Sequence, residues 1–299
     1  MTQHYTLLYI LGSGHCGSTL LDLLLNGHSQ ILGLGEIVAL KRYIALAKKV
    51  PRNSPKPLQS SCRRNQLKDW IEVESHPLDT PFWQAVKRCY ESIAEAPFDR
   101  IDTHHYSKWS TIRSWQTEDI ESWVRPNKAL LSSVHQISSR NILTDASKSP
   151  HRLYLLQRSG LFDIRVIHLL RDGRAVINSY IRKYGDFRLA LRRWAAPALL
   201  AFYVRRTFAK TDWLLVRYEE LATRPEDTLK TICAFLGVNF ESEMLVYRNQ
   251  PYFGIGGNRM REREDEHIIL DEGWRQELHR KHRLAFALIA GWLNRSYGY

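Results

Sequence analysis

The feature that most constrains the fold of this chain is its N-terminal segment, where an apolar run meets a cluster of glycines. The run YTLLYIL, at residues 5–11, leads into GSGHCGST at residues 12–19. The leucines of the following stretch fit a helix that begins at Ser18 and ends at Gly27. A buried strand, a glycine loop and a helix in this order are typical of the start of an α/β nucleotide-binding fold.

Further strand candidates recur along the chain and end in polar residues. They lie at residues 141–145, 163–170 and 212–218, and they alternate with helical stretches that include long amphipathic segments at residues 186–209 and 276–294. This alternation predicts an α/β fold, with a central parallel sheet flanked by helices on both faces. A chain of 299 residues with 44% hydrophobic residues can form one full core, and we predict a single domain over residues 1–299.

The stretch from residue 50 to residue 130 is rich in proline between short helical patterns. We predict that it forms a helical lobe inserted into the α/β fold. One interpretation makes this lobe an acceptor-binding surface, because aromatic side chains stack on sugars and phenols, and the other buries its aromatic residues in the core. Both interpretations concern five of the nine tryptophans of the chain: Trp70, Trp83, Trp109, Trp115 and Trp123.

Charge and cysteine usage limit the class of partner and the compartment. The chain has 43 Lys and Arg against 31 Asp and Glu, a formal charge of +12, which favours anionic partners. The basic residues are scattered and are not interleaved with aromatic residues, which argues against an RNA-binding module. The four cysteines have no metal-binding spacing, and no secretory signal or membrane-spanning run precedes or interrupts the domain. If Met1 is the native start, these features predict a cytoplasmic protein with reduced thiols.

The glycine cluster has the chemistry of a phosphate-binding loop. Glycines let backbone amides turn towards an oxyanion, and the start of the following helix adds positive potential. Position 18 holds a serine instead of the lysine with which P-loop nucleotidases bind the β and γ phosphates. A loop for a single 5'-phosphate group therefore fits better than a loop for a metal-bound triphosphate. The predicted contacts are Gly12, Ser13, Gly14, His15, Cys16, Gly17, Ser18 and Thr19.

A second anion site is predicted where the run at residues 163–170 leads into RDGRAVINS. Asp172 suits the N-cap of a helix, which leaves Arg171 at the carboxyl end of the strand and Ser179 about two turns into the helix. Ligands of α/β sheets bind at this edge. A guanidinium and a hydroxyl are suitable partners for a phosphate dianion. An arginine and aspartate that only cap the helix are the alternative.

In these two motifs the chain resembles the PAPS-dependent sulfotransferases, whose donor PAPS is 3'-phosphoadenosine 5'-phosphosulfate. The resemblance implies a P-loop NTPase-like sulfotransferase fold, PAPS as donor, PAP (3'-phosphoadenosine 5'-phosphate) as product and no metal ion. It also implies that Arg171 and Ser179 hold the 3'-phosphate. The family usually carries Lys or Arg where this chain has His15, and Ser where it has Cys16. The implied acceptor is a hydroxyl group, of a sugar, a lipid, a small natural product or a tyrosine.

Two later stretches extend the resemblance. VRYEEL, at residues 216–221, is one, and GGNRMR, at residues 256–261, looks like the family's C-terminal nucleotide-contacting loop. Arg259 and Arg261 are the candidate contacts in the second stretch, and a solvated basic loop is the alternative interpretation.

Three residues are candidates for catalysis. Glu36 follows the first helix at the distance where protein-tyrosine and some bacterial sulfotransferases carry their catalytic glutamate, and we predict that it is the general base and not merely the partner of a surface cation. Lys148 resembles the lysine that stabilises the bridging oxygen of the donor, with a helix-start lysine as the alternative. His15 is predicted to donate a hydrogen bond that strengthens on protonation near neutral pH, unless it faces solvent as a spacer. His104 and His105 rank below Glu36 as bases because they lie too early in the chain.

Two other functions remain open at this point. A P-loop kinase or nucleotidase would use Asp145, at the end of NILTD, to bind a metal ion, but it would lack the loop lysine. A non-catalytic protein that binds sulfated glycans or nucleic acid is compatible with the +12 charge. Magnesium dependence separates the first of these from sulfuryl transfer, and strong salt dependence without turnover identifies the second.

Overall fold

The structure, a computed structural model, describes residues 4–47, 77–103, 113–258 and 268–299. A five-stranded sheet in the order β2-β3-β1-β4-β5 lies at its centre, and every neighbouring pair of strands is parallel. The strands are β1 (Thr6–Gly12), β2 (Ile31–Leu32), β3 (Ile142–Asp145), β4 (Asp163–Leu170) and β5 (Trp213–Arg217).

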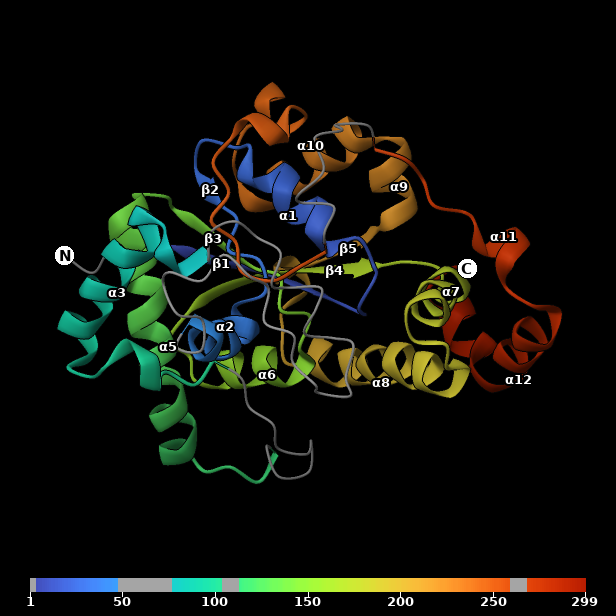
Figure 1. The fold of residues 1–299 in the computed structure, drawn as a ribbon, viewed down its shortest axis with the longest axis horizontal. Coiled ribbons are helices and arrows are strands. Elements are labelled where there is room, and N and C mark those ends of the chain that lie inside the picture. The colour runs from blue at the N-terminus through green and yellow to red at the C-terminus, as the bar shows by residue number, and fades with distance from the viewer. Residues whose placement is uncertain (1–3, 48–76, 104–112, 259–267) are drawn as a thin grey trace, which may run out of the picture.

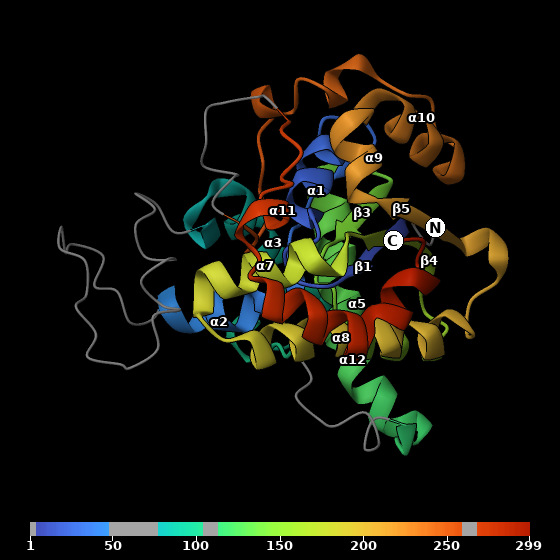
Figure 2. The ribbon, with the colours of Figure 1, turned by 90° about the vertical axis from the view of Figure 1, so that its right-hand side faces the viewer.

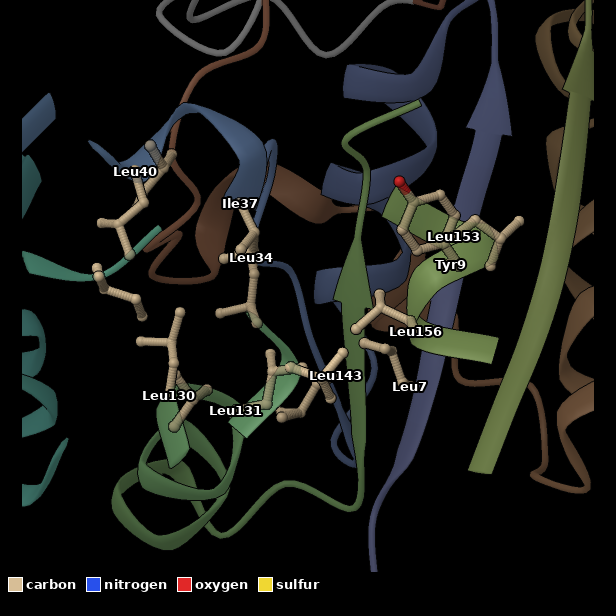
Figure 3. Packing of buried hydrophobic residues seen from close by; sticks show 14 of the residues in the cluster. Leu7, Tyr9, Leu34, Ile37, Leu40, Leu130, Leu131, Leu143, Leu153 and Leu156 are labelled. Atoms are coloured by element: carbon tan, nitrogen blue, oxygen red, sulfur yellow. The ribbon is translucent and has the colours of Figure 1, made fainter. Parts of the chain in front are cut away.

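The central strand β1 is buried on both faces, as its unbroken apolar sequence requires. Leu7 and Tyr9 belong to one hydrophobic cluster, and Leu8 and Ile10 belong to another. Because side chains alternate along a strand, these clusters lie on opposite faces of the sheet. Figure 3 shows part of the first cluster, which β1 shares with Leu153 of the helix that follows β3.

Helices cover both faces of the sheet (Figure 1). The face of Leu8 and Ile10 is covered by α1 (Ser18–Asn26), α9 (Tyr218–Thr223) and α10 (Pro225–Leu236). The opposite face is covered by α2 (Leu40–Ala47), α3 (Pro81–Ala94), α5 (Thr117–Ser138), α6 (Pro150–Arg158) and the C-terminal part of α8 (Phe187–Arg205). A third cluster joins the N-terminal part of α8 to α7 (Gly173–Tyr184), α11 (Trp274–Glu277) and α12 (Arg280–Ser296). Figure 2 shows α7, α8 and α12 side by side.

This architecture confirms the predicted α/β fold, and the predicted strands agree with β1, β3, β4 and β5 to within one residue at each end. Strand β2 was not predicted, because two residues carry no periodic pattern. The helix expected over residues 276–294 is wrong at its start. Leu278 has an extended backbone after the short α11, and α12 begins at Arg280 with the ring of His279 accepting a hydrogen bond from the amide of Lys281.

Two tryptophans of the stretch predicted as an inserted lobe are core residues. Trp83 in α3 and Trp123 in α5 are both buried, and the indole nitrogen of Trp83 donates a hydrogen bond to the carbonyl of Phe253. Trp115 packs partly buried against the same cluster, whereas Trp70 and Trp109 lie outside the described residues. The described part of the stretch also contains the 3-10 helices η3 (Pro77–Asp79) and η4 (Phe98–Arg100). The lobe boundaries at residues 50 and 130, and the single domain, stay predictions.

None of the described helices is both long enough and apolar enough to cross a membrane. Cys16, Cys89 and Cys233 are free thiols, and Cys62 lies outside the described residues. The cytoplasmic location expected from the cysteines stays a prediction.

Candidate active site

A cleft of about 1200 Å³ opens at the carboxyl ends of β1, β3 and β4. This is the edge at which parallel α/β sheets bind ligands. Two carboxylates, of Glu36 and Asp271, line it against six cationic side chains, so the described lining carries a clear excess of positive charge. The cations are Lys148, Arg171, Arg182, Lys183, Arg192 and Arg193.

The glycine loop forms one wall of the cleft, and its backbone packs closely against neighbouring side chains. A Cβ atom added at Gly14 would lie 2.0 Å from the hydroxyl oxygen of Tyr180, and one added at Gly17, where φ is +95°, would lie 2.4 Å from the ring of Tyr218. Gly17 at the N-cap position of α1 has no side chain, and no side-chain hydrogen bond caps the start of this helix, where the backbone favours an anion. The loop therefore has the backbone form that a phosphate site requires.

Six of the eight predicted loop contacts line the cleft, and two do not. The lining residues are Gly12, Gly14, His15, Gly17, Ser18 and Thr19. Ser13 lines a separate, smaller cavity. Cys16 is fully buried in the core under the loop, and this burial raises the pKa of its thiol. The side chains of Ser13 and Cys16 are thus not placed to bind the ligand, although their backbone belongs to the loop.

Arg171 and Ser179 lie together on the opposite wall. Asp172 caps α7 by accepting a hydrogen bond from the amide of Arg174 at 2.9 Å, as the sequence predicts. This cap leaves Arg171 free to reach back, and its Nη1 donates to the carbonyl oxygen of His15 at 3.0 Å. The Oγ atom of Ser179 lies 3.0 Å from Nδ1 of the same histidine. His15 therefore contacts both residues of the second predicted anion site.

Asp271 is the ion-pair partner of Arg171. Its carboxylate lies 3.2 Å from Nη2 of Arg171 and 3.0 Å from Nη2 of Arg182, and its carbonyl also accepts from Arg171. Burial opposes ionisation of Asp271, but the amide of Gly273 and the charge of Arg171 lower its pKa below the ordinary value. The guanidinium of Arg171 lies over the ring of Tyr218, and its buried Nε has no hydrogen-bond partner among the described residues. Arg171 thus retains a donor that is not used within the protein.

The environment of His15 disfavours a protonated ring. Burial, followed by the positive charges of Lys183 and Arg171, lowers the pKa of His15 to about 4. Its ring packs edge-on against Tyr180, with the ring centroids 4.5 Å apart, and does not point to solvent. Burial and the surrounding cations therefore disfavour the protonation that would strengthen its hydrogen bond, and the role of His15 in donor binding stays a prediction. The neutral ring serves as a hydrogen-bonding group.

Glu36 and Lys148 form an ion pair at the third side of the cleft. Oε1 of Glu36 lies 2.7 Å from Nζ of Lys148, and both side chains are only partly accessible. The backbone holds both residues in place. The amide of Glu36 donates to the carbonyl of Ile255 at 2.6 Å, and the amide of Gly35 donates to the buried carboxylate of Asp22 at 2.9 Å. Lys148 has a left-handed backbone, with φ of 57°, and also donates to the carbonyl of Ala146.

Asp145 lies beneath the turn that carries Lys148 and does not line the cleft. It is fully buried in an ion pair with Arg152 at 2.8 Å, and its second carboxylate oxygen accepts hydrogen bonds from the amide and hydroxyl of Ser147. Both oxygens are thus occupied by protein groups. The nucleotidase interpretation, in which Asp145 binds a metal ion, is contradicted by this burial, and the pair instead anchors the turn that presents Lys148.

Sequence reasoning missed Asp22, Tyr180 and Asp271. Tyr180 contacts His15, Asp271 contacts Arg171, and Asp22 holds the amide of Gly35 beside Glu36. Tyr180 follows Ser179 directly, and its hydroxyl lies against Gly14. No local signal marks Asp271, which lies a hundred residues from Arg171 in the sequence. Arg259, Arg261, His104 and His105 lie outside the described residues, so their predicted roles stay predictions.

Comparison with known proteins identifies a family for most of the chain. A sequence model described as the sulfotransferase family matches residues 8–242. This range includes the glycine loop, Glu36, Lys148, Arg171 and Ser179. Protein-tyrosine sulfotransferase A of Caenorhabditis elegans is 28% identical over 85 residues, which are 26% of this chain and 22% of that protein. The match thus spans about a fifth of the curated relative.

Two solved structures have the same fold over nearly the whole chain. The sulfotransferase domain of the olefin synthase from Synechococcus PCC 7002 matches with a TM-score of 0.58 and 19% identity, covering 99% of this chain and 96% of that domain. The sulfotransferase domain from the curacin biosynthetic pathway matches with a TM-score of 0.51 and 17% identity, covering 96% and 98%. At this level of identity the two structures establish the fold alone.

Proposed function

Because this chain belongs to the sulfotransferase family, we propose that it transfers the sulfuryl group of PAPS to a hydroxyl group and releases PAP. The observation that carries the proposal is the pair of contacts made by His15. Its carbonyl accepts a hydrogen bond from Arg171 and its ring contacts Ser179, so the glycine loop adjoins the second anion site. A nucleotide with phosphates on both its 5' and 3' positions has the two charged groups that such a pair of sites requires.

In this proposal, charged groups and hydrogen bonds bind the donor PAPS in the cleft. The amides of the glycine loop and the first turn of α1 bind the 5'-phosphosulfate. Arg171 and Ser179 bind the 3'-phosphate, which replaces the carboxylate of Asp271 as the partner of Arg171. The cationic excess of the lining stabilises the bound anion.

In the proposed reaction Glu36 and Lys148 act at the two ends of the transfer. The acceptor oxygen attacks sulfur and forms the new S–O bond while its proton passes to the carboxylate of Glu36. The bond between sulfur and the bridging oxygen breaks, and the electron pair leaves on the phosphate of PAP, where Lys148 offsets the developing charge. The two side chains lie 2.7 Å apart in the cleft that the glycine loop also lines.

The acceptor is proposed only as a class. A sugar, a lipid, a small natural product or a tyrosine side chain each offers the required hydroxyl. The similarity to a protein-tyrosine sulfotransferase adds weight to tyrosine, but it covers only 26% of this chain.

Calorimetric titration with PAP, with ATP and magnesium as the control, tests the proposal. Micromolar or tighter binding of PAP with little heat from ATP supports it. Binding of ATP with magnesium in preference to PAP, or binding of neither, overturns it.

A further inference from the structure

The C-terminal helix α12 exposes a stripe of large apolar side chains. Leu288 is 85% exposed, and Leu284 and Trp292 are also more than half exposed. Their spacing of four residues places the three side chains on one face of the helix. Ile289 lies beside this stripe and is likewise exposed. The opposite face, which includes Phe286 and Leu293, packs into the third hydrophobic cluster and fixes the helix on the protein.

Cations stand at both ends of this stripe. Lys281 and Arg295 are exposed and lie three residues before Leu284 and three residues after Trp292, so they share the face of the apolar residues. The helix contains no acidic residue from Arg280 to Ser296. A fixed helix with leucines and a tryptophan at the centre of its outer face and cations at the ends is the pattern of an interfacial amphipathic helix.

We propose that this face of α12 docks the protein on an anionic lipid bilayer surface, with the helix axis parallel to the membrane plane. Leu284, Leu288 and Trp292 enter the boundary between headgroups and acyl chains, where the amphipathic indole is favoured. Lys281 and Arg295 pair with anionic headgroups at the two ends of the helix. The formal charge of +12 adds long-range attraction to the same surface.

The charge pattern favours a lipid surface over a second copy of the chain. An antiparallel two-fold pairing through this stripe would bring Lys281 of each copy next to Arg295 of the other. Like charges at both ends oppose this pairing, and the helix has no carboxylate to relieve them. An anionic surface complements the same residues.

Co-sedimentation of the full chain with vesicles tests the proposal. We expect about tenfold or more tighter binding to vesicles of phosphatidylcholine with phosphatidylglycerol than to phosphatidylcholine alone, with loss of this preference at high salt. The double variant Lys281→Ala and Arg295→Ala should weaken anionic binding on the order of twentyfold, since each cation contributes about fivefold. Leu288→Asp should reduce it about tenfold or more.

Ile93→Asp is the matched control, because Ile93 is an exposed aliphatic residue of a helix elsewhere on the surface. It should bind vesicles like the original chain, and circular dichroism and PAP titration check that all variants are folded. Equal binding by Leu288→Asp and Ile93→Asp overturns the proposal, as does a lack of preference for anionic vesicles. Concentration-dependent dimers in analytical ultracentrifugation that Leu288→Asp abolishes, without vesicle binding, would assign the stripe to a second copy instead.

Discussion

Nδ1 of His15 lies 3.0 Å from Oγ of Ser179, although 164 residues separate them in the sequence. This contact joins the glycine loop to helix α7. The same histidine accepts a hydrogen bond from Arg171 through its carbonyl oxygen. The two predicted anion sites therefore meet at His15.

The contact between His15 and Ser179 predicts non-additive effects on donor binding. His15→Ala and Ser179→Ala should each weaken PAP binding, and the double variant should lose less than the sum of the two single losses, with a coupling on the order of 1 kcal/mol. Calorimetric titration of the four proteins measures this coupling. Additive losses would show that the two side chains act independently.

Arg171→Ala should weaken PAP binding on the order of a hundredfold while changing AMP binding by less than about threefold. The reason is that truncating one partner of a buried charged pair costs several kcal/mol, and AMP lacks the 3'-phosphate. Arg174→Ala is the control, because Arg174 pairs with Asp172 outside the cleft. An equal loss of PAP and AMP would contradict the assignment of Arg171 to the 3'-phosphate.

Glu36→Gln should keep PAP affinity and lower turnover by about 10²–10⁴, because the amide has the shape of the carboxylate but cannot take the acceptor proton. Steady-state turnover beside PAP titration separates the two effects. A fully active variant would move the base elsewhere, and His104 and His105 would be the next residues to substitute.

Gly14→Ala should weaken PAP binding, because the added Cβ would lie 2.0 Å from the hydroxyl oxygen of Tyr180. Overpacking of this kind costs on the order of 1–3 kcal/mol. Tyr180→Phe removes that oxygen and should restore part of the loss in the double variant. Gly291→Ala in α12 is the control, since the atom nearest its new Cβ is the flexible end of Arg295 at 3.3 Å. No recovery in the double variant would show that Tyr180 is not the obstacle.

The buried His168 should make the free energy of unfolding depend on pH. Burial lowers the pKa of His168 from 6.5 to about 4, so between these values the unfolded chain binds more protons than the folded chain. Its contribution is therefore present above pH 6.5 and is lost as the pH falls to 4, on the order of 3 kcal/mol in the free energy of unfolding.

His168→Phe should flatten this dependence, because a phenyl ring preserves the edge-on contacts with Trp213 and Tyr297. Urea denaturation at several pH values measures the difference from the original chain, and exposed His4→Phe is the control. The prediction would be refuted if the free energy of unfolding of the His168 variant changed with pH in the same way as that of the original chain.

The strands and the glycine loop were predictable because their information is local. A buried parallel strand needs an unbroken apolar run, and residues 5–11 and 163–170 supply such runs. The loop needs glycines where the backbone approaches its neighbours, and Gly14 and Gly17 meet that need. The short β2 and the start of α12 were missed because they depend on pairing and packing with distant segments.

The sequence by itself determined the α/β fold, the family and the residue types of the candidate site, since each rests on short motifs and their spacing. Only the tertiary structure decided the electrostatic state of that site. Burial among cations keeps His15 neutral, Asp145 is withdrawn into a pair with Arg152, and Asp271 reaches Arg171 from a remote segment. Desolvation and Coulomb interactions depend on distances through space, and spacing along the chain does not encode those distances.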